Sequence, residues 1–395
     1  MAESVSESAT VIYLDNAATS FPKPECVYAA ADHCLRRSGV FGRGTHSAAD
    51  NAGRMVADCR QRLAELLNVS SADRLALTFN CTDGLHLLLH GILRPDDHVI
   101  ISELDHNSVL RPIHHLMRTI GLQVTTVAFD PVSGVIDLTQ LERELKQLPV
   151  RLVVLNHASN VTGVIQPVQE VARLVHDAGA LLLLDAAQTA GHISLDVQDL
   201  GVDLLASAGH KGLLGPLGTG LVYVRPGLDD ELSPVRCGGT GTVSESLEQP
   251  AVMPAKLESG NLNLPGIAGL NAAIGWLLER TPNSIHESAN HLNEQLRGGL
   301  SALSGVTLYP GRTSASNVGI VSLAIRGYDS REAALILDQS FGIQCRAGLH
   351  CAPLVHRRLN TNASGGTIRF SPGPFTTIEE IQATIDAVAQ IADSI

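Results

Sequence analysis

The chain has 395 residues, of which 44% are apolar and 17% charged, a balance that supports a sizeable core and excludes a disordered protein. Lys and Arg number 28 against 40 Asp and Glu, and the net charge of −12 disfavours binding to nucleic-acid phosphates. The sequence has no apolar run near the ~20 residues of a membrane-spanning helix, and its polar, acidic N-terminus lacks the regions of a secretory signal, so we expect a cytoplasmic protein.

Short apolar runs alternate with helix-like segments between residues 74 and 225. The runs that we interpret as strands are 74–79, 98–102, 123–129, 150–156, 180–185, 203–208 and 220–225. Alternation of strands and helices predicts an α/β protein with a mostly parallel sheet and helices on both faces. Two runs, 150–156 and 180–185, are continuously apolar, which is typical of strands covered on both sides.

The pattern changes after Pro265. A helix-like run there ends at the breaker Thr281-Pro282-Asn283, which we interpret as a domain boundary. Beyond it we predict a helix followed by these elements: strands at 306–310 and 318–325, a helix at 330–341, a strand at 366–371 and a final helix that begins with the capping box of Thr377 and Glu380.

These elements predict two domains. The larger covers residues 12–280, and a smaller α+β domain covers residues 281–395. We expect residues 1–11 to pack on the smaller domain.

The most informative stretch lies between residues 180 and 220. The apolar run 180–185 places Asp185 at the carboxyl end of a buried strand, where parallel sheets bind ligands. Lys211 precedes the glycine-rich segment GLLGPLGTG, where the backbone can approach a bulky ligand. Pyridoxal phosphate requires a lysine that forms an imine with its aldehyde and a carboxylate that keeps its ring nitrogen protonated. Taken alone, the pair is also compatible with a turn-capping Asp185 and a solvated Lys211.

Further polar residues follow predicted strand ends. Thr82 stands at the start of a predicted helix, a natural seat for a phosphate, and His106 is placed where it could stack on a flat cofactor. Asn160 and Gln188 follow two other strands and could hydrogen-bond ring substituents. Each is also compatible with an ordinary capping or polar contact.

Two late segments carry the remaining candidates. An arginine such as Arg346 or Arg369 can bind a carboxylate through two parallel hydrogen bonds, which suits an amino-acid substrate. Cys351 lies in the loop RAGLHCAP, beside Arg346 and His350, where positive charge would favour the nucleophilic thiolate. The alternative for Cys351 is a buried, inert thiol.

Other chemistries find little support in the sequence. The seven cysteines are scattered and form no CxxC pair, so we expect neither a disulfide framework nor a zinc site. His86 and His90 are four residues apart, but no third ligand is evident, and we expect no metal. The segment GPLGTG lacks the order of a dinucleotide-binding loop.

Ten short segments stand in one order along nearly the whole chain. They are YLDNAATSFPKP (13–24), RGTH (43–46), NCTDG (80–84), DHNS (105–108), NHASNVTG (156–163), DAAQ (185–188), SAGHKG (207–212), LESGNLN (257–263), RAGLHCAP (346–353) and RFSPG (369–373). With this set the chain resembles the cysteine desulfurase/selenocysteine lyase family of the class V aminotransferase fold, nearest its group II (Suf-type) branch. The resemblance implies fold type I of the pyridoxal-phosphate-dependent transferases.

The resemblance also implies roles for individual residues. Around pyridoxal 5′-phosphate it places Lys211 as the Schiff-base lysine, Asp185 at the ring nitrogen, Gln188 at the ring hydroxyl, His106 stacked on the ring, Thr82 and His210 at the phosphate, and Cys81, Asn160 and Ser207 as further contacts. Around the substrate it places Cys351, which takes the sulfur as a persulfide, Arg346 beside it, Asn160 and Arg369 at the carboxylate, and Asn16 and Ala17 on the pocket wall. Catalysis would then fall to Lys211, Cys351 and His106.

The family is dimeric, so the resemblance implies a homodimer. Arg43 and the segments 238–241 or 259–263 would reach the neighbouring subunit's site. A sulfur-acceptor protein is a further expected partner, and iron–sulfur cluster assembly is the family's common role.

Three positions depart from the family pattern. Ala208 stands where many relatives carry a hydroxyl, and Ser207 is an uncertain replacement. Leu349 replaces a histidine before the cysteine, which removes a potential proton carrier, and Asn261 replaces a threonine. These departures bear on the substrate more than on the cofactor.

The expected reaction is removal of sulfur from L-cysteine to give L-alanine and an enzyme-bound persulfide. Three alternatives stay open: a selenocysteine lyase acting on L-selenocysteine, a fold relative that carries out β-elimination or epimerisation without a catalytic cysteine, and a non-catalytic scaffold for sulfur transfer.

Overall fold

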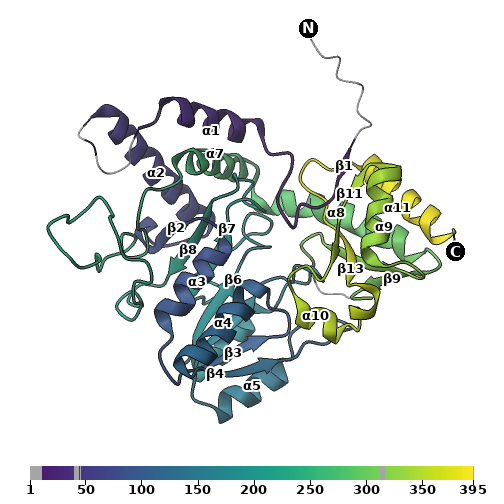
Figure 1. The fold of residues 1–395 in the computed structure, drawn as a ribbon, viewed down its shortest axis with the longest axis horizontal. Helices are drawn as coiled ribbons and strands as arrows, with labels where there is room; N and C mark the ends of the chain where they lie inside the picture. Colours follow the sequence, from purple (N-terminus) through teal and green to yellow (C-terminus); the bar gives the residue numbers. More distant parts are fainter. Residues whose placement is uncertain (1–10, 40–43, 45, 312–315, 395) are drawn as a thin grey trace, which may run out of the picture.

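The computed structural model describes residues 11–39, 44, 46–311 and 316–394 (Figure 1). Its central sheet has seven strands within these ranges, in the order β2-β8-β7-β6-β5-β3-β4. The strands are β2 (Leu75–Thr78), β3 (His98–Ser102), β4 (Gln123–Val127), β5 (Val150–Asn156), β6 (Leu181–Asp185), β7 (Leu204–Ala208) and β8 (Gly220–Val224). All seven lie close to the predicted runs, and the α/β prediction is confirmed.

One strand departs from the parallel arrangement. β8 pairs antiparallel with both β7 and β2, whereas the pairings of β3, β4, β5, β6 and β7 with one another are parallel. The cause is the connection from β7 to β8: residues 209–219 form turns without a helix, and a parallel return would need a longer crossover.

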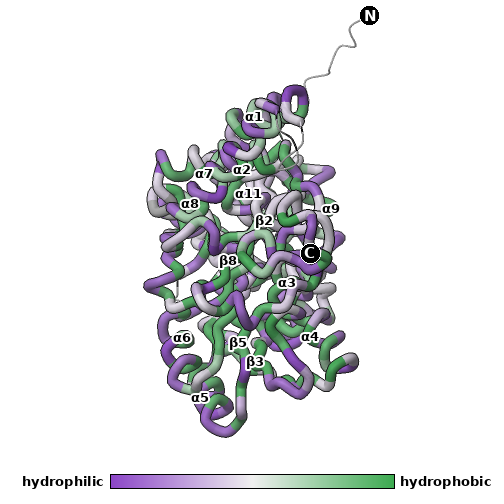
Figure 2. The backbone as a smooth tube through the Cα atoms, turned by 90° about the vertical axis from the view of Figure 1, so that its left-hand side faces the viewer, coloured by the Kyte–Doolittle hydropathy of each residue, from purple (hydrophilic) through white to green (hydrophobic). Residues whose placement is uncertain are grey.

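Helices cover both faces of this sheet, as predicted. They are α1 (Glu25–Arg37), α2 (Ser47–Leu66), α3 (Cys81–Ile92), α4 (Asn107–Ile120), α5 (Leu138–Gln147), α6 (Val168–Asp177) and α7 (Leu264–Arg280). Successive side chains of β6 enter opposite layers: Leu182 and Leu184 join the core under α2, α5, α6 and α7, while Leu181 and Leu183 join the core under α3 and α4. This double burial explains the continuously apolar run, and Figure 2 shows β3, β5 and β8 as apolar segments inside the molecule.

A second sheet lies toward the C-terminus (Figure 1). Within the described ranges it has four antiparallel strands in the order β12-β13-β10-β9. They are β9 (Val306–Tyr309), β10 (Val321–Ile325), β12 (Arg346–Gly348) and β13 (Thr367–Phe370), accompanied by α8 (Pro282–Ser301), α9 (Ser330–Phe341), α10 (Pro353–Arg358) and α11 (Ile378–Ala392). The predicted capping box of Thr377 and Glu380 is present at the start of α11.

The N-terminal segment forms a separate two-stranded sheet with a strand from the C-terminal part of the chain. β1 (Ile12–Tyr13) pairs in parallel with β11 (Ile343–Gln344), and Asp15 bridges to Ser371. Residues 1–10, for which we predicted packing on the smaller domain, lie outside the described residues, and the boundary at 281 stays a prediction. In the described part of the chain, no helix combines the length and apolar character needed to cross a bilayer.

Glycine is required where the chain turns behind Lys211. Gly191 has φ +84°, and a Cβ there would lie 2.3 Å from the carbonyl oxygen of Gly212, the residue after Lys211. Gly179 offers a matched control, because its φ is +72° and a Cβ would meet nothing within 4 Å.

We therefore expect Gly179→Ala to lower the free energy of unfolding by about 1 kcal/mol, the cost of a left-handed alanine. Gly191→Ala should cost about 1–3 kcal/mol more, because the new methyl group overpacks the backbone. Urea titration of both variants measures the difference, and equal losses would contradict this reading of the turn.

Candidate active site

A pocket opens at the carboxyl ends of β5, β6 and β7, beside the N-termini of α3 and α4. Its lining combines residues that the sequence analysis singled out with some that it did not: Asn80, Cys81, Thr82, His106, Ser108, Asn156, Asn160, Asp185, Ala187, Gln188, Ala208, His210 and Lys211. Parallel strands direct their carboxyl ends to one edge, so residues far apart in sequence meet there.

Asp185 ends β6 and is almost completely buried. Its Oδ1 accepts hydrogen bonds from the Ala187 amide at 3.0 Å and from the Cys81 thiol at 3.4 Å. Burial raises the pKa of Asp185, while the Ala187 hydrogen bond and the charge of Lys211 oppose the rise. Among the described residues, both hydrogen bonds to this carboxyl group end on Oδ1, so Oδ2 is available to a cationic group in the pocket.

Lys211 follows β7 through Gly209 and His210. The chain has four lysines, and Lys211 is the one that lines this pocket. Within the described ranges, Lys146 pairs with Glu142, Lys256 donates to a backbone carbonyl, and Lys23 donates to Ser20. Burial lowers the pKa of Lys211, against the opposing effect of Cys81 and Asp185. A lowered pKa makes the neutral, nucleophilic amine more accessible.

His106 caps the start of α4. Its Nδ1 accepts from the Ser108 amide at 3.0 Å, which fixes the ring at the pocket wall. Burial, aided by the charge of Lys211, lowers the pKa of His106 to about 4, so the ring is neutral near pH 7. The Ser108 hydroxyl also lies 2.7 Å from Thr82 Oγ1, which connects α4 to the start of α3.

Several buried polar atoms in this pocket have no partner. In the described part of the chain these include Asn156 Oδ1, Asn160 Oδ1 and His210 Nδ1. Buried polar groups are rarely left unsatisfied, so the lining is suited to a polar ligand. The pocket offers one group for each part of pyridoxal phosphate. Its carboxylate suits the ring nitrogen, and its amine of lowered pKa suits the aldehyde. Its neutral imidazole suits the ring face, and its hydroxyl at a helix N-terminus suits the phosphate.

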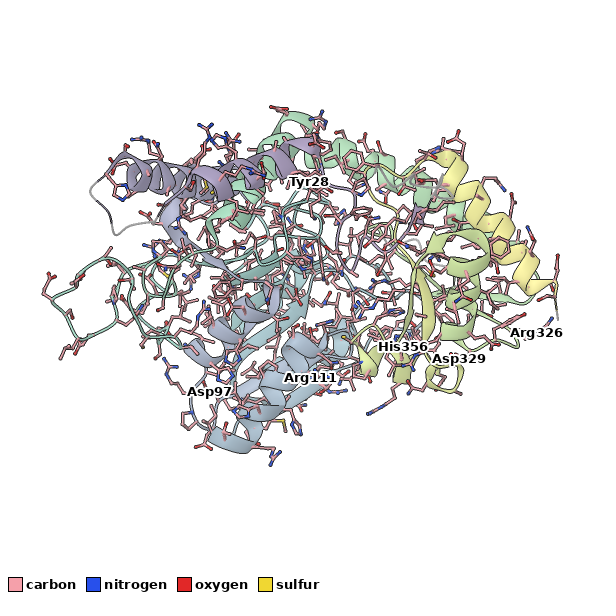
Figure 3. The ribbon with its side chains drawn as sticks, turned by 45° about the horizontal axis from the view of Figure 1, so that its top comes forward. Tyr28, Asp97, Arg111, Arg326, Asp329 and His356 are labelled. Atoms are coloured by element: carbon pink, nitrogen blue, oxygen red, sulfur yellow. The ribbon has the colours of Figure 1, made fainter. Side chains whose placement is uncertain are left out.

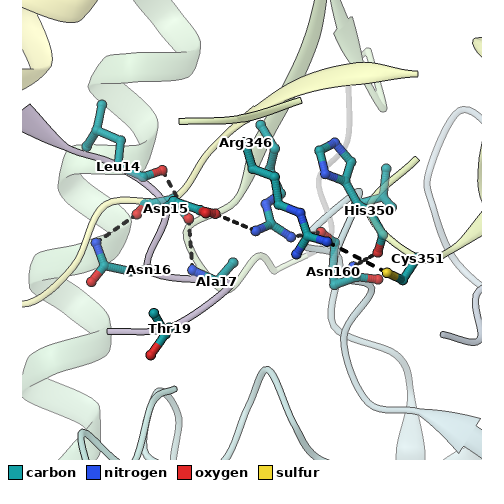
Figure 4. Close-up of polar contacts among 12 residues, drawn as sticks. Leu14, Asp15, Asn16, Ala17, Thr19, Asn160, Arg346, His350 and Cys351 are labelled. Carbon is teal, nitrogen blue, oxygen red and sulfur yellow. Dashed lines mark hydrogen bonds and ion pairs between the residues drawn. The ribbon is translucent and has the colours of Figure 1, made fainter. Parts of the chain in front are cut away.

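Cys351 lies at the edge of this region, in the turn after β12. The thiol is exposed, so the alternative of a buried cysteine is wrong. His350 and Cys351 both adopt left-handed backbone angles, with φ +48° and +59°. Arg346 Nη2 lies 3.7 Å from Cys351 Sγ (Figure 4).

Two hydrogen bonds from residues beside the seven-stranded sheet hold this turn. The Asn107 amide donates to the Cys351 carbonyl at 2.8 Å, and Asn160 Nδ2 donates to the His350 carbonyl at 2.7 Å. The His350 ring also contacts Thr367 Oγ1 at 3.0 Å. Two consecutive left-handed residues are strained, so these contacts are needed to keep the thiol where it stands.

Arg369 lies at the base of the same region and is fully buried. Its Nη2 donates to Asp15 Oδ1 at 2.7 Å and its Nη1 donates to the Asn160 carbonyl at 3.0 Å. The Nε atom has no partner among the described residues. Asn160 therefore contacts both Arg369 and the Cys351 turn, while its Oδ1 faces the pocket.

Most of the predicted residues lie on the pocket wall or beside it. Those on the pocket wall are Cys81, Thr82, His106, Asn160, Asp185, Gln188, His210 and Lys211. Arg346, Cys351 and Arg369 lie beside it, joined through Asn160.

Three predicted residues do not line the pocket directly, although the Ala17 carbonyl accepts a hydrogen bond from Nε2 of the pocket residue Gln188 at 3.0 Å. Asn16 has its amide bonded to the Ser371 carbonyl and the Phe21 amide, and the Ala17 amide donates to Ser371 Oγ. Ser207 donates to the Ala186 carbonyl and does not line the pocket, so the hydroxyl missing at Ala208 is not replaced from there.

The segments expected to reach a neighbouring subunit lie elsewhere. Residues 238–241 line a separate hollow formed with residues 242–250, and Asn261 lines another with Cys34. Arg43 lies outside the described residues.

Sequence reasoning missed Asn156, Ser108 and Asp15. Asn156 ends β5 as Asp185 ends β6, so the strand-end argument could have identified it. Asp15 gave no signal beyond its place in the segment 13–24, because its role depends on a residue 354 positions away. All seven cysteines are free in the structure, and the described residues contain no group of three or more His, Cys, Asp or Glu side chains placed to hold a metal ion.

Comparisons with known proteins agree with this geometry. Residues 12–384 match the family model of Aminotransferase class-V. The chain is similar to a probable cysteine desulfurase of Methanothermobacter thermautotrophicus, 35% identical over 386 residues that cover 96% of this chain and 94% of that protein. It is also similar to the apo cysteine desulfurase structure from Thermococcus onnurineus NA1, with a TM-score of 0.90, 30% identity and coverage of 98% and 95%. The cysteine desulfurase CsdA from Escherichia coli gives a TM-score of 0.85 at 27% identity, with the same coverage.

The contacts of Asn160 lead to a prediction about the Cys351 turn. Asn160→Ala removes the hydrogen bond to the His350 carbonyl, so the strained turn should detach more often and expose the Asn107 amide. We expect hydrogen exchange at Asn107 to accelerate at least about tenfold, since a lost buried hydrogen bond is worth roughly 1–3 kcal/mol.

Asn156→Ala is the matched control, because Asn156 lines the same pocket at the end of β5 and does not contact the turn. Exchange followed by mass spectrometry should leave Asn107 protection unchanged in that variant. Equal acceleration in both variants would show a general loosening of the pocket instead.

Proposed function

We propose that this chain, which belongs to the class V aminotransferase family, is a cysteine desulfurase that uses pyridoxal 5′-phosphate to remove sulfur from L-cysteine. The observation that carries the proposal is the meeting of Lys211 and Asp185 in one pocket with an exposed Cys351 tied to its edge. The cysteine desulfurases of similar sequence and structure support the same reaction. Assignment to the group II branch stays a prediction.

Each part of the cofactor would be bound by a different residue of the pocket. Lys211 would hold the aldehyde, Asp185 Oδ2 would accept from the ring nitrogen, and the neutral His106 would stack on the ring. Thr82, at the start of α3, and His210, with its unpartnered Nδ1, would receive the phosphate. When bound, pyridoxal phosphate supplies an electron sink for the carbon that bears the amino group.

Two arginines suit the substrate carboxylate. Arg369 keeps Nε free of partners among the described residues, although its other nitrogens bind Asp15 and Asn160. Arg346 is partly exposed, and among the described residues its guanidinium contacts the Cys351 thiol. Lys211, once free of the aldehyde, is the base available to take the α-proton, because its amine is buried in the pocket and its pKa is lowered.

Cys351 is the nucleophile toward the substrate's sulfur. Its thiolate, beside the Arg346 guanidinium, attacks that sulfur, so a sulfur–sulfur bond forms while the carbon–sulfur bond breaks. The carbon skeleton gains a proton and leaves as L-alanine, and Cys351 carries a persulfide. Neither an oxidant nor a reductant is consumed in this step.

We expect a homodimer, as in the family. The segment 238–250 carries Val243 and Leu247, which are 55% and 105% exposed, and Val252 follows at 67%. Apolar side chains grouped on one exposed segment indicate a surface that another chain covers. Light scattering of the purified chain should give twice the monomer mass; a monomer at micromolar concentration would contradict this expectation.

Substitution of the two reactive residues tests the reaction. Cys351→Ala should lower alanine release from L-cysteine by at least about 100-fold, because the sulfur then lacks its nucleophile. Lys211→Ala should abolish release and also remove the visible absorption band of the bound cofactor. Undiminished turnover of L-cysteine by the Cys351 variant would refute the nucleophile.

The same assays distinguish the alternatives. Selenium leaves more readily than sulfur and needs no thiol nucleophile, so the unaltered chain must also be compared on both substrates: turnover of L-selenocysteine without turnover of L-cysteine would favour a selenocysteine lyase. A chain that acquires no visible band after addition of pyridoxal phosphate would favour the non-catalytic scaffold.

A further inference from the structure

The surface around Cys351 carries arginines that lack acidic partners. Arginines without an ion pair also occur elsewhere in the described part of the chain, for example Arg54, Arg118 and Arg326, so the feature of interest is that several of them lie near one thiol. Arg111, Arg331, Arg346 and Arg357 have no ion pair among the described residues, and we call these four the arginine collar.

Contacts place Arg346 and Arg331 near the Cys351 turn, and chain position places Arg111 and Arg357 there. Arg346 lies 3.7 Å from the thiol. Arg111 is one helical turn beyond Asn107, whose amide binds the Cys351 carbonyl, and residues four apart share a face of a helix. Arg331 lies near Gly348, the last residue of the strand before the turn, since a Cβ on Gly348 would be 3.9 Å from its Nε.

Arg357 completes the collar from α10, which begins two residues after Cys351. Figures 1 and 3 show α4 with Arg111 next to α10 with His356, in agreement with the Asn107 contact. Arg111, Arg331 and Arg357 are exposed, as are the Cys351 thiol and the Leu349 side chain, which is 40% exposed.

Within the described ranges, the nearby carboxylates form no ion pair with the four collar arginines. Glu103 lies 3.6 Å from Arg358, and Asp15 binds the buried Arg369. Asp105 is buried, and burial raises its pKa to about 8, so it is largely uncharged near pH 7. Asp329 Oδ1 accepts from the backbone amide of Arg331.

We infer that the arginine collar selects the second substrate of the reaction, a protein acceptor whose thiol is flanked by acidic side chains. The collar spans α4, α9, β12 and α10, which is wider than a small thiol needs. Unpaired guanidinium groups at the rim of an interface attract carboxylates and speed the encounter, while Leu349 offers an apolar contact beside the sulfur.

The transfer step balances without a further reagent. The acceptor thiolate attacks the terminal sulfur of the Cys351 persulfide, a new sulfur–sulfur bond forms on the acceptor, and the bond to Cys351 Sγ breaks. Cys351 leaves as a thiolate and is ready for the next cycle. This inference rests on the proposed function for the persulfide, but the charge selection itself can be measured without it.

The first experiment alkylates the full chain, loaded with pyridoxal phosphate, with anionic iodoacetate and with neutral iodoacetamide. Peptide mass spectrometry gives the rate of modification by iodoacetate divided by the rate of modification by iodoacetamide at each cysteine. This ratio should be at least threefold higher at Cys351 than at exposed Cys26. Each of Arg111→Gln, Arg331→Gln and Arg357→Gln should lower it about two-fold, as expected for unit charges several ångströms apart in water. Arg118→Gln, on the last turn of α4, is the matched control and should leave it unchanged.

The second experiment measures sulfur transfer from the persulfide to the blocked peptides Glu-Glu-Cys-Glu-Glu and Lys-Lys-Cys-Lys-Lys. Each rate is normalised to the peptide's reaction with a neutral disulfide, which removes differences in thiolate fraction. We expect the acidic peptide to react about tenfold faster, the preference to fall below two-fold in the triple glutamine variant, and 0.5 M salt to weaken it.

The two experiments separate the possible failures. Equal alkylation ratios at Cys351 and Cys26, or equal peptide rates, would overturn the collar while leaving desulfuration intact. Loss of the preference in Arg118→Gln would also overturn it. If no persulfide forms but the alkylation ratios follow the collar, the proposed function has failed and the charge selection stands.

Discussion

The arrangement of this molecule depends on a buried carboxyl group and a buried amine that face one pocket. Asp185 and Lys211 each follow an apolar strand of the same sheet, and both are deprived of water. Isolated buried charges are costly, so such a pair persists only where the fold enforces it or a ligand satisfies it. The unpartnered atoms of Asn156, Asn160 and His210 around the pair indicate a ligand.

The second constraint is the connection between the pocket and the thiol. Cys351 follows a strand of the four-stranded sheet, yet its turn is held by Asn107 and Asn160, which lie beside the seven-stranded sheet. Arg369 strengthens this connection, because its buried guanidinium joins β13 to Asp15 and to the Asn160 carbonyl. The nucleophile is therefore fixed relative to the pocket by contacts between the two sheets' sides of the molecule, and the exposed side of its turn faces the arginine collar.

The strands of the seven-stranded sheet could be predicted because a strand that is buried on both faces has a continuous apolar sequence, such as residues 180–185. The antiparallel direction of β8 could also have been inferred from the short connection before it. The strand β12 and the helix α10 were missed, since three and six residues are too few to show a period. Asp185, Lys211 and Cys351 stood out by chemistry and family order, whereas Asp15, Ser108 and the turn-holding contact of Asn160 depend on tertiary neighbours that no local pattern encodes.

The most direct test of the account is the identity of the residue that binds the cofactor's aldehyde. The full chain is loaded with pyridoxal phosphate, reduced with borohydride and digested, and the modified peptide is found by mass spectrometry. We predict a stoichiometric phosphopyridoxyl group on Lys211. Modification at Lys23, Lys146 or Lys256 instead, or none at all, would contradict it.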